Sequence, residues 1–172
     1  MPIRSSPAGP SKDIAFIDLE ASGLSARSWP IEVGWCFLGE KPRALLIKPA
    51  KDWSLDDWNP EAEALHGVAH KTLVAKGADL KRVCEELNGA LAGRQVYSDA
   101  PDWDGFWLYR LFQAAQIRQR FTLKDLGNLF QATPSEKMDA ILAEAERRAP
   151  RKHRATPDVL HMRTLYELVY SQ

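Results

Sequence analysis

The sequence predicts a single α/β domain in which helices flank a mixed β-sheet, with an antiparallel meander of three strands joined by parallel strands. Two observations predict this class. Three apolar runs rich in strand formers lie close together at the start of the chain, and the remainder alternates short strands with segments of helical periodicity. The 172 residues, 45% of them hydrophobic and 27% charged, suit one globular domain with a continuous core.

The three strands of the meander are expected near residues 14–17, 31–38 and 43–47. The first run is almost entirely apolar, which is typical of a central strand that is covered on both faces. Residues 39–42 (GEKP) form a turn-type segment between the other two strands and favour a hairpin. Residues 1–12 contain Pro, Ser and Gly, and we expect them to be disordered, so that residues 13–172 form the domain.

Helical spacing dominates the rest of the chain. The last helix is expected to have Thr156 as its N-cap and Pro157 at its first position. The other elements expected are helices at residues 60–65, 71–75, 80–91, 101–116, 135–148 and 157–170, a strand at 95–98, and a brief strand that passes into a helix within 121–130.

The composition limits the classes of function. The 23 basic and 23 acidic side chains cancel, so the whole chain exerts no long-range attraction on a polyanion, and any phosphate binding must be local. Cys36 and Cys84 lie in apolar stretches without the spacing of metal ligands, and we expect both to be reduced core residues. No stretch approaches the roughly 20 apolar residues of a membrane span. We therefore expect a cytoplasmic protein that does not interact with membranes.

An acidic pair follows the first apolar run. Asp18 and Glu20 are two residues apart on a strand, so their side chains project from the same face, about 6.6 Å apart along it. The two carboxylates repel each other unless a cation lies between them, although in a loop both could simply be solvated. They directly precede the small-residue loop ASGL at residues 21–24, and strand ends of open α/β sheets are where ligand sites form.

The segment FIDLEASGL at residues 16–24, followed by IEVG at residues 31–34, resembles the first motif of the DEDD exonucleases, the family of the DnaQ-like and RNase T-like enzymes. The resemblance implies an RNase H-like sheet. It also implies further acidic and histidine positions along the chain.

The second motif of that family is similar to residues 103–108 (WDGFWL), which makes Asp104 a metal-binding acid. Asp99 and Asp102 compete for this role, and an aspartate near a helix start can also act only as a cap. The family commonly carries His-Asn before this aspartate, whereas this chain has Asp99 and Ala100.

The third motif, His-x-x-x-x-Asp, matches residues 153–158 (HRATPD). It is the histidine-type motif, DEDDh. Asp158 would lie on the first turn of the last helix, and His153 on the loop before it. The alternative is that Asp158 only caps the helix and His153 is a surface residue.

Together these positions suit phosphodiester hydrolysis by two divalent cations about 3.5–4 Å apart. The expected ligands of Mg²⁺ or Mn²⁺, which prefer oxygen, are Asp18, Glu20, Asp104 and Asp158. His153 is the expected general base, because histidine exchanges protons readily near neutral pH.

The resemblance also implies substrate contacts from Ser22, Gly23 and Leu24, with Leu24 on a base, and from His66, because residues 64–68 (ALHGV) are similar to a His-Gly-Ile segment of the family. Trp107 is a candidate for base stacking, although we expect at least two of the three aromatic residues Trp103, Phe106 and Trp107 to be buried.

Two features have competing interpretations. His66 and His70 have the i, i+4 spacing of a zinc pair, but Gly67 weakens the helix that such a pair needs. Five cationic side chains lie in the segment from Arg147 to Arg154, which is either a solvated surface or a grip on the phosphate backbone.

The sequence therefore predicts a 3′-5′ exonuclease that releases nucleoside 5′-monophosphates from 3′ ends of single-stranded nucleic acid or short oligonucleotides. The alternatives are a catalytically silent nucleic-acid-binding module of the same fold and a phosphodiesterase acting on small nucleotides. RNA and DNA are not distinguished by these motifs, because recognition of the 2′-OH depends on pocket shape. A homodimer is compatible with the sequence.

Overall fold

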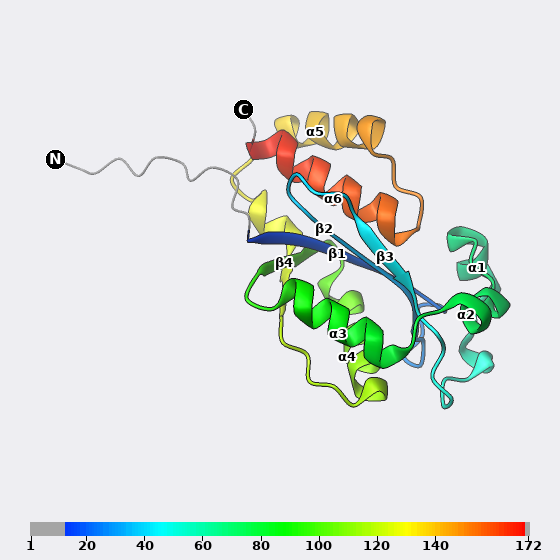
Figure 1. The fold of residues 1–172 in the computed structure, drawn as a ribbon. Helices are drawn as coiled ribbons and strands as arrows, with labels where there is room; N and C mark the ends of the chain where they lie inside the picture. Colours follow the sequence, from blue (N-terminus) through cyan, green and yellow to red (C-terminus); the bar gives the residue numbers. More distant parts are fainter. Residues whose placement is uncertain (1–12, 171–172) are drawn as a thin grey trace.

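A five-stranded mixed sheet lies at the centre of the computed structural model, which describes residues 13–170, so the disorder expected at residues 1–12 lies outside the described residues. Its strand order is β3-β2-β1-β4-β5, with β1 in the middle (Figure 1). β1, β2 and β3 are antiparallel neighbours, whereas β4 is parallel to β1 and β5 is parallel to β4. The predicted meander and the predicted parallel strands are both confirmed. The strands are β1 (Ile14–Ala21), β2 (Pro30–Phe37), β3 (Arg43–Leu46), β4 (Gln95–Ser98) and β5 (Leu123–Asp125).

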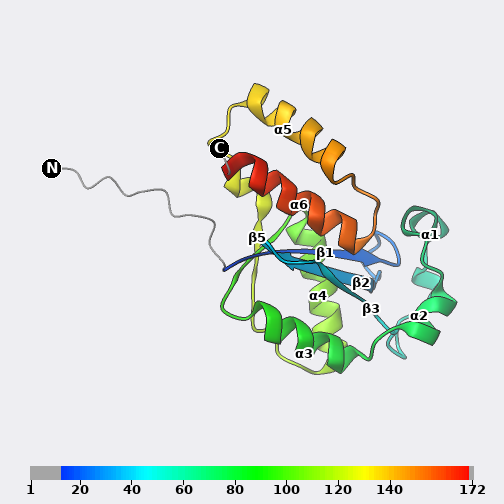
Figure 2. The same cartoon turned by 45° about the horizontal axis from the view of Figure 1, so that its top comes forward.

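Helices cover both faces of the sheet. In Figure 2, α3 (Leu80–Leu91) and α4 (Pro101–Ala115) lie on one side of the strands, and α5 (Ser135–Arg148) and α6 (Ala155–Tyr170) lie on the other. Within the described part of the chain, none of the helices combines the length and hydropathy of a membrane span. The remaining elements are α1 (Pro60–His66), α2 (His70–Lys76) and the 3-10 helices η1 (Leu55–Asp57) and η2 (Leu126–Leu129).

Two hydrophobic clusters, one on each face of the sheet, show toward which face each side chain of β1 projects. Ile17 packs in the cluster beneath α3 and α4, whereas Phe16 packs in the cluster that includes residues of α6. Because side chains alternate along a strand, Asp18 and Glu20 share the face of Phe16. The acidic pair therefore lies on the side of the sheet that α6 covers.

The start of α6 differs from the prediction. The helix begins at Ala155, so Thr156 and Pro157 both lie inside its first turn. The predictions that Thr156 is the N-cap and that Pro157 is the first helical residue are therefore wrong. The reason is a long-range interaction: the carboxylate of Glu32, on β2, accepts a hydrogen bond from the Ala155 N–H at 3.1 Å and two from the Arg154 guanidinium at 2.8 Å each. A strand residue thus supplies the acceptor that a local side chain was expected to supply.

Two other expectations can be compared with the fold. The segment within residues 121–130 forms β5 followed by the 3-10 helix η2, a tighter helix than expected. Cys36 and Cys84 are buried and not disulfide-bonded, as predicted.

Gly34 on β2 allows α6 to approach the sheet closely. A Cβ atom at Gly34 would lie 2.8 Å from Ala155 Cβ and 2.9 Å from the Ala155 carbonyl carbon. These separations are too short for carbon atoms, and the backbone of Ala155 cannot move without shifting the start of α6. Gly34 therefore sets the position of the helix turn that carries Asp158.

Gly34→Ala is expected to lower the free energy of unfolding by about 1–3 kcal/mol, because overpacking forces the backbone to shift. Gly89→Ala is the matched control: Gly89 lies inside α3 and a Cβ there meets no atom within 4 Å. That change should stabilise the protein by up to about 1 kcal/mol, since alanine favours a helix over glycine. Urea unfolding of both variants measures the difference, and equal midpoints would contradict the close approach.

Candidate metal centre

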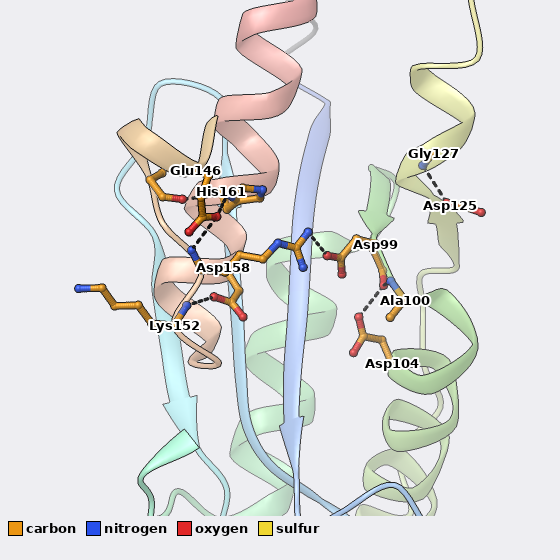
Figure 3. Close-up of polar contacts among 12 residues, drawn as sticks. Asp99, Ala100, Asp104, Asp125, Gly127, Glu146, Lys152, Asp158 and His161 are labelled. Atoms are coloured by element: carbon orange, nitrogen blue, oxygen red, sulfur yellow. Dashed lines mark hydrogen bonds and ion pairs between the residues drawn. The ribbon is translucent and has the colours of Figure 1, made fainter. Parts of the chain in front are cut away.

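The structure brings the predicted acidic residues together around the end of β1. Oxygen atoms of Asp18, Glu20 and Asp158 lie within 4.8 Å of one another, and so do those of Asp18, Asp99 and Asp104. Figure 3 shows Asp158 on one side of β1, and Asp99 and Asp104 on the other. Asp18 belongs to both groups, so it lies between two sets of carboxylates.

Asp104 is held by the sheet rather than by its own helix. Its Oδ1 accepts a hydrogen bond from the Leu19 N–H at 3.3 Å, and its Oδ2 accepts one from the Ser98 hydroxyl at 2.5 Å. Only 1% of Asp104 is exposed, whereas Asp102, on the same helical turn, is exposed. Among the described residues, Asp99 and Asp104 join the carboxylate groups and Asp102 does not.

Asp158 and Asp18 differ in how their oxygens are satisfied. Asp158 is buried on the first turn of α6, and its Oδ1 accepts a hydrogen bond from the Lys152 N–H at 2.9 Å. Asp18 Oδ2 is buried and has no hydrogen-bond partner among the described residues. A buried acceptor without a donor is costly, and a cation would satisfy it. The carboxylates present therefore fit a hard divalent cation.

Burial governs the protonation of this cluster. It raises the pKa of Asp18 well above its ordinary value, and the nearby charges of Asp104 and Glu20 raise it further. Burial followed by the charge of Asp158 raises the pKa of Glu20 to about 8, and burial raises that of Asp104 to about 7. Without a cation, these groups retain protons near neutral pH. Cation binding should therefore release protons.

The metal-free protein is expected to lose stability as the pH rises from about 4.5 toward 8. Glu20 has a pKa of about 8 in the folded chain and near 4.5 when unfolded, so the folded state binds more protons in this window. The free energy of unfolding then falls with increasing pH. Glu20→Gln removes one such group and should make the fall shallower, as measured by urea unfolding between pH 5 and 8 with a chelator present. Parallel curves for the two proteins would show that Glu20 does not titrate in this way.

His153 lies on the loop between α5 and α6. Its side chain is exposed, and its backbone has φ 51°, in the left-handed region that non-glycine residues rarely adopt. The loop is fixed on both sides of it, by the Lys152 N–H bonded to Asp158 and by Arg154 bonded to Glu32. The carboxylate groups found among the described residues do not include His153.

The loop that follows Glu20 exposes one of its three candidate substrate contacts. Ser22 is buried, and its hydroxyl accepts a hydrogen bond from the Trp29 N–H at 3.0 Å. A Cβ on Gly23 would lie 3.1 Å from Asn59 Cβ, so Gly23 packs closely against Asn59. Leu24, in contrast, is 69% exposed and borders a hollow of about 580 Å³.

His66 and Trp107 are both buried. His66 Nδ1 accepts a hydrogen bond from the Val68 N–H at 3.0 Å, while its Nε2 is buried without a partner among the described residues. Burial lowers the pKa of His66. Trp107 donates its indole N–H to the Ser28 hydroxyl at 3.0 Å.

The other aromatic residues of this region are more exposed than expected. Trp103 is 37% exposed and stacks on Trp107 with ring centroids 5.4 Å apart. Phe106 is half-buried, so Trp107 is the one buried residue of the three.

His66 and His70 both place their rings edge-on against Trp58, at centroid distances of 5.9 and 5.6 Å. The two histidines are thus parts of an aromatic cluster.

Sequence reasoning did not assign roles to Glu32 and Arg154. Glu32 is 4% exposed, pairs with Glu20 in the register of β1 and β2, and is neutralised by Arg154. Glu32 lies within the segment IEVG and is an acid inside an otherwise apolar strand, which was a usable signal. Nothing local marks Arg154 as its partner, because the two residues are 122 positions apart.

The chain was compared with known proteins. A scan against protein-family models finds no match, and a search of curated proteins finds none. Solved structures of exonuclease I are similar, each with 92% of this chain covered. One has a TM-score of 0.70 at 16% identity, the E. coli enzyme in complex with a 5cy-dA13 oligonucleotide has 0.67 at 16%, and a moderately thermophilic exonuclease I from Methylocaldum szegediense has 0.68 at 18%.

This likeness establishes the fold, an RNase H-like mixed sheet flanked by helices. The chain spans about two fifths of the length of these proteins, with 40–41% of each covered.

Proposed function

We propose that this chain is a metal-dependent 3′-5′ exonuclease of the DEDD family, histidine type, acting on single-stranded nucleic acid. The observation that carries the proposal is that Asp18 belongs to two groups of three carboxylates whose oxygens lie within 4.8 Å of one another. Such an arrangement suits two cations that share one ligand. The exonuclease I fold supports it, and one such structure is a complex of the E. coli enzyme with a dA16 oligonucleotide.

The proposed cations are two Mg²⁺ or Mn²⁺ ions, held by Asp18, Glu20, Asp104 and Asp158. When bound, such ions activate the attacking water and stabilise the charge that develops on the phosphate and the leaving oxygen. Ser98 and the Leu19 N–H fix the orientation of Asp104, and the Lys152 N–H fixes that of Asp158.

His153 is proposed to accept the proton of the attacking water. Its side chain is exposed and so accessible to a bound substrate. The hydrogen bonds made by the neighbouring residues hold the loop beside Asp158. The left-handed backbone at His153 is consistent with this role, because strained residues persist mainly at functional sites.

The substrate is proposed to enter past the loop after β1. Leu24 would pack on the terminal base, with Ser22 and Gly23 holding the loop in shape. Trp107 would act from behind, by supporting the more exposed ring of Trp103. His66 would also act from behind this loop, because it is only 4% exposed and its ring interacts with the Ala21 backbone.

The test uses 5′-labelled single-stranded DNA and RNA of equal length, incubated with the protein and Mg²⁺ or Mn²⁺, with Asp18→Asn as the inactive comparison. We expect a ladder of products that shorten stepwise from the 3′ end, together with nucleoside 5′-monophosphates. Internal cuts would indicate an endonuclease. Binding of the oligonucleotide without any cleavage by either metal would indicate a silent module and contradict the proposal.

A further inference from the structure

A fifth carboxylate and an arginine meet at the metal centre. Asp99 follows the last residue of β4, and its oxygen lies within 4.8 Å of those of Asp18 and Asp104. Asp99 Oδ2 is also in contact with the Arg151 guanidinium, at 2.5 Å. Figure 3 shows this ion pair on Asp99, and Asp158 on the other side of β1. The Arg151 guanidinium is therefore bound to one member of the carboxylate group formed by Asp18, Asp99 and Asp104.

The loop that carries Arg151 spans the site. The Lys152 N–H is bonded to Asp158, and Arg154 is bonded to Glu32, so the residues after Arg151 are fixed on the α6 side. The side chain of Arg151 reaches from there to Asp99 on the β4 side. Burial raises the pKa of Asp158, and the Lys152 N–H and then the charge of Arg151 oppose that rise. The guanidinium thus acts on carboxylates on both sides of β1.

Arg151 differs from the other arginines of the basic segment. Arg147 and Arg148 pair with Glu144 on α5, which is not a member of the two carboxylate groups. Arg154 pairs with Glu32 on β2. Among the described arginines of this segment, Arg151 is the one whose ion pair is with a member of those groups.

We propose that Asp99 is an additional ligand of the metal centre and that Arg151 competes with a divalent cation for it, so that cation binding releases Arg151 to bind a phosphate of the nucleic acid. The proposal rests on the proposed function. A guanidinium and a divalent cation repel each other at close range, so both cannot occupy Asp99 favourably. A released arginine suits phosphate, because its planar fork can bind two phosphate oxygens.

The first measurement is Mn²⁺ binding by calorimetry in the absence of nucleic acid. Arg151→Gln removes the competing charge and should tighten the weaker Mn²⁺ site by about fivefold or more. Asp99→Asn should weaken that site by a similar factor. Arg148→Gln, whose partner Glu144 lies on α5, should leave Mn²⁺ binding unchanged. Unchanged Mn²⁺ affinity in Arg151→Gln, with an unchanged melting temperature, would overturn the proposal.

The second measurement is oligonucleotide hydrolysis at saturating Mn²⁺. Arg151→Gln should raise KM about tenfold with little change in kcat, and Arg151→Lys should restore part of the loss. An unchanged KM would overturn the phosphate-binding step. If Mn²⁺ affinity shifts as expected but the wild type cleaves no nucleic acid, the proposed function fails and the competition for Asp99 stands.

Discussion

Replacing Asp104 with asparagine is expected to reduce the rate of hydrolysis at 3′ ends by about a thousandfold or more. The carboxylate is 1% exposed, is held by the Leu19 N–H and the Ser98 hydroxyl, and lies within the group that includes Asp18. Asparagine keeps the shape but loses the charge that would bind a cation. The rate is measured from release of nucleoside 5′-monophosphate at saturating Mn²⁺.

Asp102→Asn is the control for this prediction. Asp102 lies on the same turn of α4 but is exposed, and we expect its rate to stay within about twofold of the wild type, as for most surface changes. In metal-free protein, Asp104→Asn should not lower the melting temperature, because burial raises the pKa of the carboxyl to about 7 and disfavours its charged form. Equal losses of activity in the two variants would mean that Asp104 has no special role.

Replacing His153 with asparagine is expected to lower kcat by about 10² to 10⁴, the usual loss when a general base is removed. Mn²⁺ affinity should remain as in the wild type, because the carboxylate groups do not depend on His153. Asparagine is chosen because it tolerates the left-handed backbone at this position better than most residues. Single-turnover kinetics and calorimetric Mn²⁺ binding separate the two effects.

Two further variants exclude a structural explanation. His153→Gly relieves the backbone strain at φ 51° and should be as inactive as His153→Asn while unfolding no more easily. Lys152→Ala removes the adjacent exposed side chain but keeps the N–H that binds Asp158, and its kcat should be nearly unchanged. A His153→Asn enzyme with a kcat close to the wild type would refute the assignment of the base.

The parts of the fold that depend on local pattern were predictable from the sequence. The apolar run before Asp18 identified a central strand, and alternation placed Asp18 and Glu20 on one face of it. The hairpin segment at residues 39–42 predicted the meander. The start of α6 was predicted wrongly because Glu32 accepts the hydrogen bonds there. Glu32 and Arg154 are 122 positions apart, and no local sequence pattern indicates such a contact.

The positions of three neighbouring aspartates also required the structure. Asp99, Asp102 and Asp104 lie within six residues; the family resemblance favoured Asp104, and Asp99 and Asp102 competed for the same role. Asp102 and Asp104 are two residues apart on α4, so their side-chain directions differ by about 200° of helical rotation, and Asp102 is exposed whereas Asp104 is buried. Asp99 joins the site because β4 is parallel to β1 and ends beside it. Similarly, the structure shows that Trp103, not Trp107, retains an exposed ring.

The central claim is that the carboxylates around Asp18 hold divalent cations. The most direct measurement is anomalous diffraction from crystals of the protein soaked with Mn²⁺ and a nucleoside 5′-monophosphate. We expect one Mn²⁺ peak among Asp18, Glu20 and Asp158 and another among Asp18, Asp99 and Asp104, each in direct contact with a carboxylate oxygen of Asp18. A well-ordered crystal without an anomalous peak in contact with Asp18 would contradict the claim.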